Sequence, residues 1–277
     1  MRNFLKLTNF EFNRISKLLF SLMGFVLLIQ LIGVFFEVWM YNNRIDSLMT
    51  ENQMTEAQAL NQVGELSFAM VMYSMFFLGP IFISVGAMLF YIFLIWYREW
   101  FGKNTFIYRL LMLPTERINI FFSKLVTIVV ATLTLVGFQF LALLIENSIF
   151  NALVSDPFLS EMNVVNLISQ DPLISMIFPH SLDGILLVYG FGAVIVGVLF
   201  TAILLERSYR IKGIAAAILY AIVVSALLAS PFAVNELLLN GYMYPGEILF
   251  TFAVMALLVL MVSIVISRKL LNDKIRV

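Results

Sequence analysis

Residues 68–96 read FAMVMYSMFFLGPIFISVGAMLFYIFLIW, a run of 29 residues without a single Asp, Glu, Lys or Arg. A helix needs about 20 consecutive apolar residues to cross the hydrocarbon core of a bilayer, so this run is long enough to span a membrane. Its apolar residues are continuous rather than alternating, which excludes a strand of a closed membrane barrel. Gly79 and Pro80 lie inside the run and predict a kink or a break in the helix.

Five further apolar runs accompany this one. The chain has 277 residues, of which 62% are hydrophobic and 12% are charged. Soluble domains have about 45–50% apolar and about 25% charged residues, so lipid must solvate much of this chain. The sequence therefore predicts an all-α membrane protein with six transmembrane helices. The predicted spans cover residues 18–40, 68–96, 120–145, 185–205, 214–232 and 248–267.

The positive charges are distributed unevenly along the chain. Of the 17 Lys and Arg residues, all but Arg44 lie in the N-terminal arm, in the connections after the second and fourth spans, or in the C-terminal tail. The positive-inside rule places these segments in the cytoplasm, so both termini are predicted to be cytoplasmic. The formal net charge is zero and gives no indication of nucleic-acid binding.

The N-terminal arm, residues 1–17, is predicted as a separate element before a single transmembrane domain over residues 18–277. Polar residues recur every three or four positions in the arm, with apolar residues on the opposite side. This pattern favours a basic amphipathic helix that lies on the inner leaflet, with membrane lipid as its partner. A charged topology anchor without a further role is the alternative. The arm lacks the pattern of a cleavable signal.

The connection between the second and third spans is unusually long and charged. Residues 96–125 read WYREWFGKNTFIYRLLMLPTERINIFFSKL. Pro114 is expected to end any helix that precedes it. Thr115 then offers a hydroxyl that can cap the following helix, with Glu116 in its first turn. The pattern predicts a short helix over 98–106, a break, and a new start for the third span, forming a docking surface at the cytoplasmic face.

This connection resembles the corresponding segment in the membrane subunits of ATP-binding cassette (ABC) transporters of the type-2 permease family. The family pattern has an acidic residue and a glycine after the second span, then Leu-Pro with a small polar residue, then a lysine that opens the next span. The matching positions here are Glu99, Gly102, Leu113-Pro114-Thr115 and Lys124. The six-span layout, the N-terminal interfacial helix and the two cytoplasmic termini match over essentially the whole chain.

The resemblance implies that the connection holds a coupling helix, which fits a groove on a separate nucleotide-binding ATPase subunit. The residues expected to couple to that subunit are Arg98, Glu99, Trp100, Phe101, Gly102 and Lys103. The chain has no GxxxxGK[ST] phosphate loop, so ATP and Mg²⁺ would be bound by the partner and this chain is not expected to be an enzyme. A second copy, or a similar permease, would complete the pathway. A solvated basic turn is the alternative interpretation.

Two further sets of residues are candidates for helix packing or for the pathway. Small residues at four-residue spacing in the fifth span are Ala217, Ala221, Ser225 and Ala229. This spacing lets helices approach closely in lipid, either within one subunit or at a dimer seam. Gln30 and Gln139 lie deep in the first and third spans, where a polar group usually finds a partner. An interhelical hydrogen bond and a substrate contact both remain open for them. The segment after the fifth span is predicted as either a re-entrant element or an interfacial loop.

The remaining polar residues exclude several classes of function. No ionisable residue lies near the centre of a predicted span, which argues against a proton-coupled carrier. Glu37 and Glu146 lie near span ends, where water is expected to be close. With no cysteine and one histidine, the chain cannot form a Cys/His metal site. No HExxH, Ser/His pair or intramembrane Asp pair indicates a membrane protease.

The predicted function is therefore the permease subunit of an ABC exporter, by resemblance in a bacterial plasma membrane. The apolar, charge-poor spans suggest a hydrophobic or amphipathic substrate, and antimicrobial or signalling peptides and lipid-like compounds are candidates. The alternative is a membrane sensor or scaffold that recruits a cytoplasmic ATPase or another partner without transporting anything.

Overall fold

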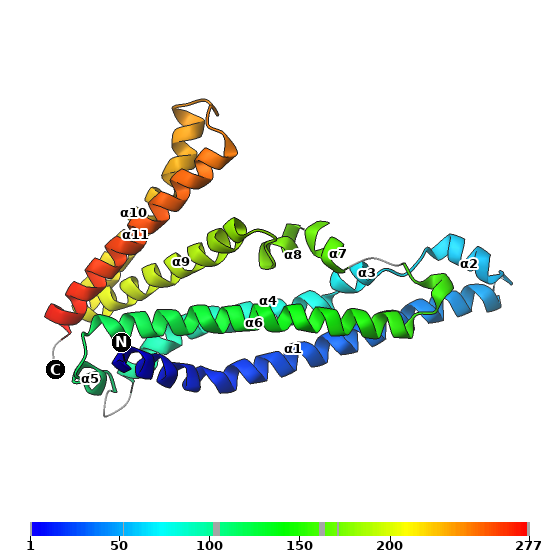
Figure 1. The fold of residues 1–277 in the computed structure, drawn as a ribbon, viewed down its shortest axis with the longest axis horizontal. Coiled ribbons are helices and arrows are strands. Elements are labelled where there is room, and N and C mark those ends of the chain that lie inside the picture. The colour runs from blue at the N-terminus through cyan, green and yellow to red at the C-terminus, as the bar shows by residue number, and fades with distance from the viewer. Residues whose placement is uncertain (1, 52, 102–105, 161–163, 171, 276–277) are drawn as a thin grey trace. The chain divides into compact units, whose positions relative to one another are not determined.

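The structure, a computed structural model, describes residues 2–51, 53–101, 106–160, 164–170 and 172–275. These residues are mostly helical, and no strand occurs among them (Figure 1). The elements are α1 (Arg2–Glu51), α2 (Glu56–Val63), α3 (Phe68–Met72), α4 (Met75–Trp100), α5 (Phe106–Leu111), α6 (Ile118–Leu153), η1 (Asp156–Phe158), α7 (Val164–Gln170), α8 (Pro172–Ile177), α9 (Leu182–Tyr209), α10 (Ile211–Leu237), α11 (Pro245–Lys269) and η2 (Leu270–Lys274).

Six helices in the described part of the chain are long and apolar enough to cross a membrane, by length and composition. They are α1, α4, α6, α9, α10, and α11 together with η2. The prediction of an all-helical, multi-pass membrane protein with six candidate spans is thereby confirmed. The cytoplasmic placement of the two termini stays a prediction.

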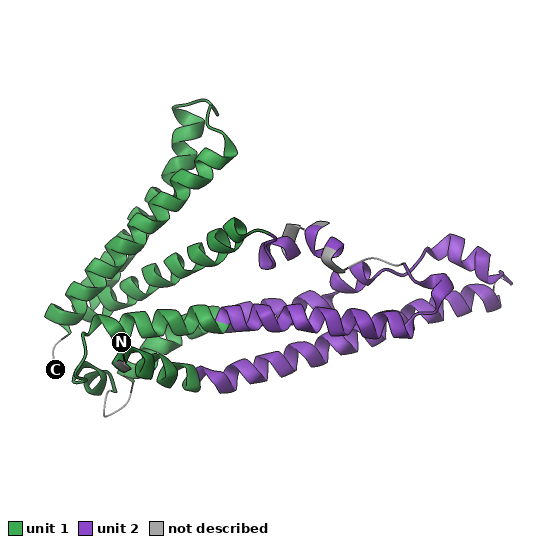
Figure 2. Cartoon of the chain, viewed as in Figure 1, with its two compact units in different colours: residues 1–14, 88–131, 181–277 green, residues 15–87, 132–180 purple. Residues whose placement is uncertain are grey.

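The chain divides into two compact units (Figure 2). Unit 1 contains residues 1–14, 88–131 and 181–277, and unit 2 contains residues 15–87 and 132–180. Helices α1, α4 and α6 contribute residues to both units. Neither unit is continuous in sequence, so this division differs from the predicted division into residues 1–17 and 18–277.

Helix α1 is one unbroken helix of 50 residues. The sequence suggested an interfacial helix over residues 1–17 followed by a separate span, but no break separates the two. The physical reason is the absence of any glycine or proline before Gly24, so nothing interrupts the backbone hydrogen bonding. The interfacial role of the arm and its boundary with the first span near residue 17 stay predictions.

The interruption expected at Gly79 and Pro80 occurs earlier in the chain. Helix α3 ends at Met72 and α4 begins at Met75, whereas α4 runs through Pro80 without ending. Pro80 cannot donate the backbone hydrogen bond to the residue four positions earlier, a loss that helices in lipid tolerate. The Ser84 hydroxyl donates a hydrogen bond of 2.9 Å to the Pro80 carbonyl oxygen, which is a separate contact.

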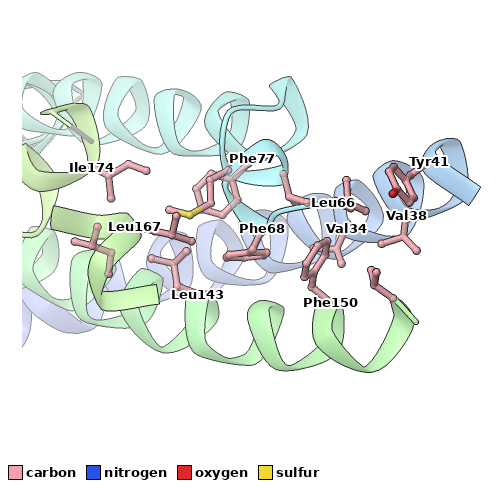
Figure 3. Close-up of a cluster of buried hydrophobic side chains, with 14 of the residues drawn as sticks. Val34, Val38, Tyr41, Leu66, Phe68, Phe77, Leu143, Phe150, Leu167 and Ile174 are labelled. Atoms are coloured by element: carbon pink, nitrogen blue, oxygen red, sulfur yellow. The ribbon is translucent and has the colours of Figure 1, made fainter. Parts of the chain in front are cut away.

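Unit 2 packs around one cluster of buried apolar side chains (Figure 3). The labelled members are Val34, Val38 and Tyr41 of α1, Leu66, Phe68 of α3, Phe77 of α4, Leu143 and Phe150 of α6, Leu167 of α7 and Ile174 of α8. Helices α1 and α4 approach closely at Gly33, where an added Cβ would lie 2.5 Å from the Cβ of Phe76. Glycine is therefore required at this contact.

Helices α9, α10 and α11 pack against one another within unit 1. Their shared core consists of Val194, Val224, Ala256 and Val259. Buried hydroxyl groups also join them. The Thr201 and Ser267 hydroxyl oxygens lie 3.0 Å apart, and those of Tyr220 and Ser263 lie 2.6 Å apart. These hydrogen bonds satisfy polar groups that would otherwise be costly among apolar helices.

The small-residue ladder of α10 does not contribute to this packing. Ala221, Ser225 and Ala229 are exposed and Ala217 is only half-buried, whereas Val224 is buried. Packing within one subunit therefore does not explain the ladder, and its role as a dimer seam stays a prediction.

The segment after the fifth span is a short connection between two helices, and its re-entrant or interfacial nature stays a prediction. Helix α10 continues through Pro231 to Leu237, and α11 begins at Pro245. The Asn235 side-chain oxygen accepts a hydrogen bond of 2.9 Å from the N–H of Met243. This bond closes the connection between the two helices.

Candidate functional site

Lys124 is the centre of a buried cluster of charged side chains in unit 1. It lies in α6 and its side chain is 0% exposed. Its ammonium group donates hydrogen bonds to the Glu11 carboxylate (2.5 Å), the Ile95 carbonyl oxygen (2.9 Å) and the Glu99 carboxylate (3.3 Å). The Trp96 ring lies beside it, with its centroid 5.4 Å from Nζ. One buried lysine thereby connects α6 to both α1 and α4.

Two arginines complete the cluster. Arg14 of α1 donates a hydrogen bond of 2.7 Å to the Glu99 carboxylate. Arg98 of α4 donates to the Glu11 carboxylate and, at 2.9 Å, to the Tyr91 hydroxyl. We call these five residues, Glu11, Arg14, Arg98, Glu99 and Lys124, the charge cluster.

The charges of the cluster are arranged by depth. Glu11, Glu99 and Lys124 are buried, whereas the two arginines are partly exposed. Three cations face two carboxylates, so the surplus positive charge lies on the arginines, where water can reach it. Charge-assisted hydrogen bonds of this kind are about twice as strong as neutral ones. Removing one partner from such a group leaves an uncompensated buried charge, which is strongly destabilising.

The connection between α4 and α6 is attached to other parts of unit 1 as well. The Asn3 side-chain amide donates a hydrogen bond of 3.2 Å to the Pro114 carbonyl oxygen. The rings of Phe10 and Phe106 stack with centroids 5.9 Å apart. Arg117 donates hydrogen bonds of 2.8 Å and 3.1 Å to the carbonyl oxygens of Leu271 and Ile275. The connection is therefore held by the N-terminal arm and by the C-terminal segment.

Large apolar side chains are exposed along the same connection. Phe101 is 71% exposed and Met112 is 69% exposed, and Tyr108 and Leu113 are exposed as well. We call these four residues the connection patch. Because residues 101–117 lie between two candidate spans, these side chains are not part of a helix that crosses lipid. Exposed apolar groups at such a place are typical of a contact with a protein or with the membrane surface.

The predicted coupling residues lie in different surroundings. Glu99 is fully buried in the charge cluster and Arg98 is mostly buried, so Glu99 offers no surface to a partner. Trp100 is half-buried and Phe101 is exposed. Gly102 and Lys103 lie outside the described residues. Their joint role in coupling stays a prediction.

The helix starts in the connection also differ from the prediction. Arg98, Glu99 and Trp100, expected in a separate short helix over 98–106, belong instead to the last turn of α4, and the next described helix is α5, at Phe106–Leu111. No helix runs through Pro114, as predicted.

The helix of the third span begins at Ile118, just before the predicted span over 120–145. Thr115 and Glu116 therefore precede the helix. The Thr115 hydroxyl accepts a hydrogen bond of 2.6 Å from the Asn119 side chain instead of capping a backbone N–H.

Gln30 and Gln139 contact each other inside unit 2. The Gln139 amide donates a hydrogen bond of 3.2 Å to the Gln30 side-chain oxygen, and the Gln30 amide donates one of 3.2 Å to the Phe77 carbonyl oxygen. The interhelical hydrogen bond left open by the sequence is present. A role in the pathway stays a prediction.

Sequence reasoning missed Glu11 as a member of the site. The signal was available in part, because Leu7, Glu11, Ile15 and Leu19 recur every four residues and all four are buried. An acidic residue in the middle of such an apolar stripe is unusual, since a buried carboxylate needs a cation.

No family model, curated protein or solved structure matches the chain. The site is therefore interpreted from its own geometry and from the resemblance of its motif.

Proposed function

We propose that this chain is the permease subunit of an ABC exporter, which forms half of a translocation pathway and couples to a separate ATPase subunit. The observation that carries the proposal is the α4–α6 connection. The motif residues at its two ends, Glu99 of α4 and Lys124 of α6, are both buried, with the Glu99 carboxylate 3.3 Å from the Lys124 ammonium group. The connection between these helices exposes the connection patch. A solvated turn that only fixes the orientation of the spans needs neither the buried charge pair nor the exposed apolar side chains.

The proposed docking surface is the connection patch, not the charged end of α4. A groove on the ATPase would receive Met112 and Leu113, with Phe101 and Tyr108 beside them. Apolar and aromatic anchors of this kind supply most of the binding energy in protein interfaces. ATP and Mg²⁺ would be bound by the ATPase subunit.

The charge cluster supplies the mechanical link in this proposal. The ends of α4 and α6 bracket the connection, and Lys124 joins both helices to α1 through Glu11 and Glu99. A displacement of the connection by the ATPase would therefore move three helix ends together. Packed cores respond to such displacements by changing between discrete arrangements rather than by deforming gradually.

The proposed substrate is a hydrophobic or amphipathic molecule, such as a peptide or a lipid-like compound. The support is the apolar character of the six candidate spans. A second copy of the chain, or a similar permease, would provide the other half of the pathway, and the exposed small residues of α10 are the proposed seam. The proposed location is a bacterial plasma membrane.

A pull-down with the ATPase encoded nearest to this chain tests the docking surface. The test variant carries Met112→Asp and Leu113→Asp. We expect the wild-type chain to retain the ATPase and this variant to lose it. Both side chains are exposed, and burying a carboxylate in an apolar groove is unfavourable. Glu99 is left intact, since its replacement would test folding rather than docking.

The matched control carries Leu238→Asp and Tyr242→Asp, two exposed side chains in the connection between α10 and α11. It adds the same charge and should retain the ATPase. If the wild-type chain retains no ATPase, the proposal of an ABC permease is wrong. If the ATPase binds but reconstituted vesicles show no ATP-dependent transport of any amphipathic substrate tested, the sensor or scaffold function gains support instead.

A further inference from the structure

Glu146 of α6 is a buried carboxyl group that the proposed coupling does not use. The sequence placed it near the end of a span, where water should be close, but it is 0% exposed. Neither of its carboxylate oxygens has a hydrogen-bond partner among the residues that the structure describes. The ion pairs of the charge cluster all lie in unit 1, whereas Glu146 belongs to unit 2. A buried carboxyl group is costly to ionise unless a cation pairs with it, so a cation that reached this position would stabilise the charged form.

The surroundings of Glu146 are apolar and aromatic. It follows Leu143 by three residues and precedes Phe150 by four, so it shares their buried face of α6. Both neighbours belong to the unit 2 cluster, in which the rings of Phe68 and Phe150 lie 5.5 Å apart (Figure 3). Aromatic faces attract organic cations and offer nothing to an anion. The position therefore combines one carboxyl group with an apolar and aromatic face of α6, which suits the two parts of an amphipathic cation.

A metal ion is a poor candidate for the positive partner. Calcium takes six to eight oxygen ligands and magnesium needs six in octahedral geometry. No group of three or more His, Cys, Asp or Glu side chains that could hold a metal occurs in the described part of the chain. The charge of a single ammonium or guanidinium group, in contrast, is balanced by one carboxylate.

The charge of unit 2 also favours a cation. Residues 41–67 and 147–180 of this unit, which include the C-terminal ends of α1 and α6, carry seven acidic residues against one basic residue, Arg44. The acidic residues are Asp46, Glu51, Glu56, Glu65, Asp156, Glu161 and Asp171. A surface of one sign raises the local concentration of molecules of the opposite sign.

We infer that Glu146 binds the ammonium or guanidinium group of an amphipathic organic cation, whose apolar part packs against the unit 2 cluster. Only the further identification of this ligand as the transported molecule rests on the proposed function. The binding itself is a property of this chain and needs no ATPase.

The test measures binding of dodecylammonium to the purified full-length chain in phosphatidylcholine nanodiscs. Dodecanol serves as the neutral probe of equal chain length. Apparent dissociation constants come from the concentration dependence of the melting temperature, followed by tryptophan fluorescence. The variants are Glu146→Gln, which keeps the shape and removes the charge, and Asp46→Asn, which removes one exposed charge from the same unit.

We expect dodecylammonium to stabilise the wild-type chain and Asp46→Asn equally, and to bind Glu146→Gln at least about tenfold more weakly, as expected for the loss of a buried charge partner. Dodecanol should not distinguish the three proteins. Equal binding of dodecylammonium to Glu146→Gln and wild type would overturn the inference. So would stabilisation of the wild-type chain by sodium chloride alone, because the ligand would then be an inorganic cation. A failed ATPase pull-down leaves all of these outcomes unchanged.

Discussion

Arg210 adopts a backbone conformation that suits glycine much better than arginine. Its φ is 53° and its ψ is −125°, and it forms the single-residue connection between α9 and α10. This region is the first central position of a type II′ turn, which glycine dominates. The connection is also crowded, because a Cβ on Gly213 would lie 2.3 Å from the Leu205 carbonyl oxygen. The strain at Arg210 is therefore local and can be removed by one substitution.

The first prediction is that Arg210→Gly raises the thermal stability of the purified chain. Relief of this strain is worth about 1–3 kcal/mol, of which the greater freedom of glycine in the unfolded chain offsets about 1 kcal/mol. Arg210→Ala is the control, since it removes the same side chain and keeps the Cβ. Equal melting temperatures for the glycine and alanine variants would contradict the assignment of strain to this residue.

The second prediction concerns Lys124 at the centre of the charge cluster. Lys124→Met should lower the free energy of unfolding by about 3–5 kcal/mol, because Glu11 and Glu99 would lose their buried cation. Combining it with Glu11→Gln should recover part of the loss. Denaturation in detergent measures both effects. Lys6→Met, an exposed lysine on the same arm, should have almost no effect, and a comparable loss in that variant would argue against a special role for the cluster.

At the scale of the element, helix existence was predictable from sequence while helix ends were not. The six spans follow from long apolar runs, which can be recognised in the sequence without knowledge of the fold. The ends depend on contacts: α1 continues past residue 17, and the Thr115 hydroxyl accepts a hydrogen bond from the Asn119 side chain. The candidate site was likewise predictable only in part. The motif identified Glu99 and Lys124, but Glu11 reaches them only when chain segments more than 80 residues apart come together.

The third prediction compares two glycines of α1 in different surroundings. Gly33→Ala should destabilise the chain by about 1–3 kcal/mol, because its Cβ would overlap the Cβ of Phe76 on α4 and force the two helices apart. Gly24→Ala should leave stability unchanged or raise it by up to about 1 kcal/mol, since nothing lies within 4 Å of the added Cβ and alanine favours the helix. The melting temperatures of the two variants measure this difference in stability. A similar change in both would show that the contact between α1 and α4 is not close at Gly33.

At the scale of the whole molecule, the positive charges predict the orientation of the six candidate spans. The chain contains no cysteine, so single cysteines can be introduced without any preparatory substitution. Three exposed positions are suitable: Ser47 near the C-terminal end of α1, and Met112 and Tyr242 in two of the connections. Met112 lies in the connection that carries Arg109 and Arg117, whereas the segments around the other two positions carry only Arg44.

The fourth prediction is that a membrane-impermeant maleimide labels Ser47→Cys and Tyr242→Cys in intact cells, and labels Met112→Cys only after the cells are permeabilised. The physical reason is that the positive-inside rule retains Lys- and Arg-rich connections in the cytoplasm. The chain is expressed without the ATPase, so that a bound partner cannot protect Met112→Cys. Labelling of all three variants after permeabilisation controls for access. Labelling of Met112→Cys in intact cells would place the connection patch outside, where no ATPase could reach it, and the proposed coupling would fail together with the predicted orientation.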